Sequence, residues 1–181
     1  MAHVPKHLSR FATFYQHPLQ IRLALGTWLE NLPLSTWVHE STSIWAQPTV
    51  LTLHTMGMGV LVGASWVLDL RLLGINRNVP LSAFRWVFRA VAISLAVNLV
   101  TGVLLFMARA TLWGTAFPFA IKIGLVVASA ATMLPIRSYV LSSDPNQTEV
   151  SGRARMLAIA SILAWAAAIT SGRLLAYTVA G

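Results

Sequence analysis

The sequence contains no cysteine and little charge, especially negative charge. Of its 181 residues, 10% are charged, and only 5 are Asp or Glu against 13 Lys or Arg. Without cysteine, the chain has no thiol nucleophile, iron–sulfur cluster, covalently attached c-type haem or disulfide bond. Soluble domains carry roughly 25% charged residues, whereas 56% of this chain is hydrophobic. We therefore expect an integral membrane protein whose excess apolar residues face lipid.

Four apolar stretches are long enough to cross a bilayer core, which takes about 20 mostly apolar residues. They cover residues 50–73, 85–108, 116–136 and 156–179. The connections between them are short, so neighbouring spans should run antiparallel. The sequence predicts an all-α integral membrane fold, in which residues 50–181 form an antiparallel bundle of four transmembrane helices.

Residues 1–49 contain no apolar run long enough to span the membrane or to form the core of a secretory signal. From residue 23 onward, leucines and tryptophans alternate with polar residues such as Glu30 and His39. This mixture is typical of helices in the membrane interface, and Pro33 should divide them in two. We expect an N-terminal interfacial helical segment that caps the bundle or serves only as an anchor. Residues 1–22 suggest no role.

The basic residues flank the apolar runs, and most arginines fall in the first and third links between spans. Because basic residues accumulate on the cytoplasmic side, we expect a multi-pass protein of the bacterial inner membrane with both termini on the outer, periplasmic side. The opposite orientation is favoured by three basic residues near the N-terminus, Lys6, Arg10 and Arg22, but they lie far from the first span. The scattered charge does not favour nucleic acid as a partner.

The predicted spans contain a few strongly polar residues, which are costly in lipid and often mark function. In the outer half of the bundle they are His54, Asn98, Thr101, Lys122 and Arg173. With a rise of about 1.5 Å per residue, they lie roughly 6 to 15 Å inside the outer edge. All four spans contribute, so a shared pocket is expected. Taken one at a time, each residue could instead pack in the bundle, form a hydrogen bond between helices, or extend its side chain to the lipid headgroups.

The charges in this layer favour an anionic ligand. Lys122 and Arg173 would repel each other without an anion between them, because no carboxylate lies at their depth. Haem b satisfies this requirement, since its propionates would pair with the two cations while His54 binds the iron. A quinone head group, hydrogen-bonded by the same side chains, fits nearly as well. We expect electron transfer to quinone or to a periplasmic redox partner.

The alternative function is copper binding or transport through His54, Met58 and neighbouring methionines. His54 and Met58 share one helix face, and imidazole with thioether favours Cu(I), whereas Met56 points away. A second axial haem ligand is not evident; it could be His39, Met58 or Met107, or the iron could be five-coordinate. A third possibility is an accessory or anchor subunit without a cofactor, in a homo- or hetero-oligomer.

Asp69 and Arg71 lie near the inner end of the first span. Residues two apart on a helix do not face each other, so each should pair with another element. We expect Asp69 to meet Arg85 or Arg89, and both residues to fix topology and lock the bundle.

Several segments resemble a family of bacterial four-span membrane proteins of unknown function. They are Trp28–Ser35, Asp69–Gly74, Phe119–Lys122 and Ser171–Tyr177, with Pro48, His54, Gly63 and Trp165 between them. The resemblance runs from Trp28 to Tyr177 and implies a four-helix membrane bundle.

A more distant similarity concerns His54 in the first span, Lys122 in the third and, loosely, Arg71. This pattern is similar to that of the haem-containing membrane protoporphyrinogen oxidases. It is also similar to that of copper-resistance membrane proteins partnered by a periplasmic copper carrier. The similarity implies a haem or copper site at His54.

Overall fold

The computed structural model describes residues 19–144 and 147–179, and over these ranges it contains helices and turns but no strand. Residues 19–30 are helical. The other elements are α2 (Pro33–Glu40), α3 (Gln47–Leu73), the short 3₁₀ helix η1 (Leu81–Phe84), α4 (Arg85–Met107), α5 (Ala110–Thr115), α6 (Phe117–Ser142) and α7 (Gly152–Val179). Helices α3, α4, α6 and α7 are long and apolar enough to cross a bilayer. The predicted four-span, all-α fold is confirmed.

The helices extend further than the apolar runs. Helix α6 continues through Pro135 to Ser142, and α7 begins at Gly152, ahead of its first long apolar run. Backbone hydrogen bonding continues into polar sequence, and a proline removes only one donor from a helix whose other turns remain bonded. The second link contains α5, where we expected only a short connection.

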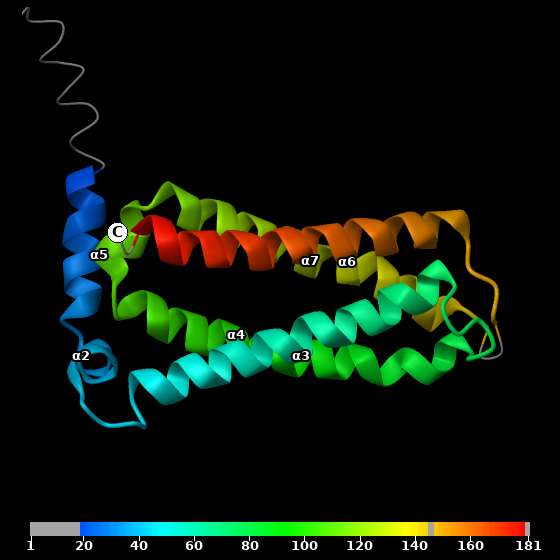
Figure 1. Cartoon of the computed structure of the whole chain (residues 1–181), viewed down its shortest axis with the longest axis horizontal. Helices are drawn as coiled ribbons and strands as arrows, with labels where there is room; N and C mark the ends of the chain where they lie inside the picture. The colour runs from blue at the N-terminus through cyan, green and yellow to red at the C-terminus, as the bar shows by residue number, and fades with distance from the viewer. Residues whose placement is uncertain (1–18, 145–146, 180–181) are drawn as a thin grey trace, which may run out of the picture.

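The four spans form an incomplete ring. Helix α3 packs along both α4 and α7, and α6 packs along α7, whereas α4 and α6 touch at few points. Figure 1 shows the four helices running side by side between two ends of the molecule. One end, called the cap end here, contains helix 19–30, α2, α5 and the end of α7. The opposite end, called the arginine-rich end, contains the links after α3 and after α6. The ring is therefore open between α4 and α6.

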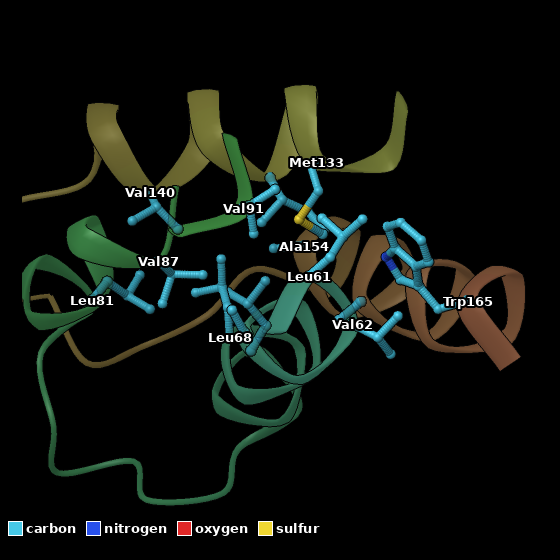
Figure 2. Packing of buried hydrophobic residues seen from close by; sticks show 14 of the residues in the cluster. Leu61, Val62, Leu68, Leu81, Val87, Val91, Met133, Val140, Ala154 and Trp165 are labelled. Carbon is cyan, nitrogen blue, oxygen red and sulfur yellow. The ribbon is translucent and has the colours of Figure 1, made fainter. Parts of the chain in front are cut away.

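The hydrophobic core occupies the half of the bundle nearer the arginine-rich end. Its members come from all four spans and include Leu61, Leu68, Val87, Val140 and Trp165 (Figure 2). In the cap half, by contrast, no residue of α3 over 51–60 or of α6 over 117–128 is buried. The bundle is thus tightly packed at one end and loosely packed at the other.

The described part of the N-terminal segment, residues 19–49, lies across one end of the bundle, and its position in the membrane interface stays a prediction. Helix 19–30 and α2, separated at Pro33, lie crosswise to the spans (Figure 1). The Glu30 carboxylate accepts hydrogen bonds from the backbone N–H of Thr111 at 2.8 Å and from its hydroxyl at 2.6 Å. The Ser35 hydroxyl donates to the backbone oxygen of Met107 at 2.7 Å. These bonds attach the cap to the end of α4 and to α5.

Replacing Glu30 with alanine should release the cap. The variant loses both bonds to Thr111, one of them to a backbone N–H at the start of α5, which costs about 1–3 kcal/mol locally. We expect faster amide hydrogen exchange over residues 19–30, measured on the detergent-purified protein, with unchanged exchange in α3. Glu40→Ala is the matched control, because Glu40 is exposed at the end of α2. Equal exchange in the two variants would contradict the anchoring role.

Arg71 joins two loops at the arginine-rich end. Its guanidinium donates to the backbone oxygens of Val79 at 2.8 Å, Arg77 at 3.0 Å and Thr148 at 3.0 Å. Helix α3 ends two residues later at Leu73, and the next residue, Gly74, has a φ of 109° that favours glycine. Arg71 therefore holds the link after α3 against the link between α6 and α7.

The expected pairing of Asp69 with Arg85 or Arg89 is wrong. Asp69 is fully buried and faces the Ser161 hydroxyl of α7, whereas Arg85 and Arg89 are exposed at the start of α4. The reason is the packing order, because α3 presents this face to α7 while the two arginines lie on the open side of α4.

Candidate functional site

Two neighbouring helices bring an imidazole and a hydroxyl together in the cap half. His54 lies two turns into α3 and is half-buried, and Thr101 lies in the cap half of α4 and is buried. His54 Nδ1 is 2.9 Å from Thr101 Oγ1. The imidazole also faces the backbone oxygen of Asn98, one turn before Thr101. The ring of His54 is thus held against α4 by the hydroxyl of Thr101.

The partners of Thr101 favour one tautomer of His54. The hydroxyl of Thr101 has one hydrogen, and it is directed to the backbone oxygen of Val97 at 2.7 Å. When that hydrogen is donated to Val97, Oγ1 accepts a hydrogen bond from His54, and the imidazole proton is then on Nδ1. Nε2 then carries a lone pair. This is how proteins orient histidines that bind metals, with the second nitrogen fixed by a hydrogen bond.

Lys122 faces this site from α6. Its side chain is half-buried and packs on Gly172 of α7, where a Cβ would lie 3.5 Å from Lys122 Cε. Its charge acts electrostatically on His54. Asp69 is the only acidic residue within the four spans, and it lies at the opposite end. An ammonium group at this depth lacks a carboxylate partner from the spans and favours an anionic ligand.

Asn98 adds an unsatisfied acceptor to the layer. Its side chain is buried and donates from Nδ2 to the backbone oxygen of Ser94 at 2.9 Å, while Oδ1 has no hydrogen-bond partner. A buried amide oxygen without a donor is uncommon and costs free energy. The polar layer therefore holds one buried acceptor without a donor.

Glycines make room for these side chains, and sequence analysis did not connect them with the site. A Cβ on Gly57 would lie 2.6 Å from Asn98 Nδ2, and one on Gly102 would lie 3.3 Å from His54 Cε1. Gly172 performs the same role for Lys122. The spacing in the sequence indicates this role, since Gly57 follows His54 by three residues and Gly102 directly follows Thr101.

Three of the candidate residues are not part of this arrangement. Arg173 is exposed, because it follows Gly172 and so points about 100° away from the helix face that meets Lys122. His39 is exposed on α2, and Met58 is half-buried against the hydrophobic core. Over residues 19–144 and 147–179, no three His, Asp or Glu side chains are grouped as a metal site would need.

Comparisons with known proteins add no assignment. No protein-family model, curated protein or solved structure matches the chain. The resemblance to four-span membrane families stays a prediction, and the site has to be interpreted from its own geometry.

Removing the hydroxyl of Thr101 should free the imidazole of His54. In Thr101→Val, neither a donor nor an acceptor remains opposite Nδ1, so we expect a mixture of tautomers where the native protein has one. The nitrogen chemical shifts of isotope-labelled histidine, recorded on the protein in bicelles, distinguish the tautomer with the proton on Nδ1 from the tautomer with the proton on Nε2. Thr52→Val is the control, because the exposed Thr52 hydroxyl bonds only to its own helix. A proton on Nε2 in the native protein would contradict the assignment.

Proposed function

We propose that this membrane protein binds haem b in the cap half of the bundle, with His54 Nε2 as a ligand of the iron. The observation that carries the proposal is the hydrogen bond from His54 Nδ1 to Thr101. With the imidazole proton on Nδ1, Nε2 has a lone pair available for iron in a part of the bundle where the spans are loosely packed.

The charge of Lys122 supports the same ligand. A haem propionate supplies the carboxylate that the spans lack at this depth, and an ammonium held beside Gly172 is suited to pair with it. Arg173 was expected to bind the second propionate, but its exposed position favours a role at the membrane surface. We therefore assign only Lys122 to this pairing.

Bound haem would supply one-electron chemistry, and this chain would bind it, orient it and limit its contact with water. We propose that electrons pass to quinone or to a soluble redox partner at the cap end. The concentration of arginines at the other end favours a cytoplasmic location for that end, with the cap facing the periplasm across a bacterial inner membrane.

Titration of haemin into the detergent-purified, haem-free protein tests the proposal. We expect saturation at one haem per chain with a shifted Soret band, and the same result for His39→Ala. Titration with Cu(I) in parallel tests the copper alternative, in which Met58→Leu should lose the metal. Binding of copper without haem would overturn the haem proposal. Binding of neither, with co-purification of another membrane protein at fixed stoichiometry, would overturn it in favour of an accessory subunit.

A further inference from the structure

The open side of the bundle is a groove between α4 and α6. It has a volume of about 460 Å³ and lies in the half nearer the arginine-rich end. Its walls come from Phe88 and Leu95 on α4 and from Leu134 and Leu141 on α6, and Leu61 and Trp165 reach it from α3 and α7. The groove faces the surrounding lipid, since Leu134 is 69% exposed. It is separate from the polar layer around His54.

The groove has the length of one membrane leaflet. On α4 its lining runs from Arg85 to Leu95, which corresponds to about 15 Å at 1.5 Å per residue. On α6 it runs over Ala130–Leu141, with a similar extent. Half of a hydrocarbon core of about 30 Å is also about 15 Å. An occupant that fills the groove therefore reaches from the membrane surface to the bilayer centre.

The charges of the groove are all positive and all at one end. Arg85 and Arg89 lie one helical turn apart on the same face of α4, and Arg137 lies opposite them on α6. No acidic residue lines the groove. Three guanidinium groups above an apolar channel complement a molecule with an anionic head and a hydrocarbon chain.

We propose that this groove is a binding site for an anionic phospholipid. Arg85, Arg89 and Arg137 hold the phosphate, and one acyl chain lies between α4 and α6 over Phe88, Leu95 and Trp165. The lipid occupies the gap that α4 and α6 leave in the ring and so holds the two helices in place. A soluble anion lacks the chain that these apolar walls require, and a zwitterionic lipid offers a positive group to the three arginines. The site does not depend on haem binding.

Native mass spectrometry of the full chain in detergent, titrated with dioleoyl phosphatidylglycerol or dioleoyl phosphatidylcholine, tests this site. We expect one phosphatidylglycerol to bind more tightly than phosphatidylcholine. Arg85→Gln and Arg137→Gln should each weaken binding about fivefold, since each basic residue near an anionic surface contributes on the order of 1 kcal/mol. Arg153→Gln, exposed at the same end but outside the groove, should bind as the native protein does.

A second variant separates shape from charge. Ala92→Trp keeps all three arginines but fills the middle of the groove, and it should weaken phosphatidylglycerol binding as well. Thermal unfolding of each variant in detergent shows whether the fold is retained. Equal affinity for the two lipids, or equal losses in Arg153→Gln and Arg85→Gln, would overturn the proposal. Soluble glycerol phosphate binding as tightly as the lipid would show a free phosphate site instead.

Discussion

Replacing Arg71 with methionine should lower the free energy of unfolding by about 3 kcal/mol or more, because hydrogen bonds from a charged donor contribute about 1.5–3 kcal/mol each. The Arg71 guanidinium donates hydrogen bonds to three backbone oxygens in two loops, and the residue is 1% exposed. Methionine retains the apolar stem but leaves these oxygens without their donor. The links after α3 and α6 should then separate.

Unfolding in mixed micelles of dodecyl maltoside and SDS measures this effect. Arg153→Met is the matched control, since Arg153 is exposed at the same end of the bundle and should change stability little. Arg71→Lys should lie between the two, because an ammonium group replaces the fork of donors with a point charge. A loss below about 1 kcal/mol in Arg71→Met, the size of one ordinary hydrogen bond, would show that the loops are held by other contacts.

Replacing His54 with glycine should abolish haem binding, and added imidazole should restore it. Changes to groups that only orient a metal ligand weaken binding by about 10- to 100-fold, so loss of the ligand itself should exceed this range. The glycine variant leaves a space beside Thr101 in which free imidazole has the same hydrogen-bond partner. Soret absorbance after haemin titration, with and without imidazole, measures both steps.

His39→Gly is the control for the His54 variant, because His39 is exposed on α2 and outside the polar layer. Its haem content should equal that of the native protein. Haem bound equally well by His54→Gly without imidazole would show that another residue ligates the iron. Lys122→Met should bind haem more weakly yet retain the native ligand spectrum, because it loses the propionate partner and not the iron ligand.

The fold could be predicted because a bilayer leaves few choices. Apolar runs of sufficient length must be helical so that every backbone group is bonded, and short links make neighbours antiparallel. The residues at which the helices end could not be predicted from hydropathy, as the continuation of α6 through Pro135 shows. Hydropathy indicates where the apolar sequence ends, whereas a helix ends where its backbone hydrogen bonds end.

The depth of each site residue could also be predicted, but not its direction. The rise per residue places His54, Thr101 and Lys122 in one layer, and the structure brings these three side chains near one another. Arg173 has the right depth as well, yet Gly172 is the residue that faces Lys122. The direction of a side chain depends on how each helix is rotated, and this rotation is set by packing with its neighbours.

Asp69 illustrates the same limit. Its neighbour could not be deduced until the order of helices around the ring was known, and that order places Ser161 of α7 opposite it. The packing order also determines which side of the bundle stays open, and therefore where Arg85 and Arg137 come together.

The proposed binding of haem by His54 Nε2 in the cap half of the bundle can be tested directly. The most direct measurement is the dithionite-reduced minus oxidised absorption spectrum of protein purified from cells supplied with haem precursor and copper, with iron and copper content on the same sample. We expect a b-type haem spectrum and about one iron per chain, both absent from His54→Gly. A colourless native protein without iron would contradict the claim.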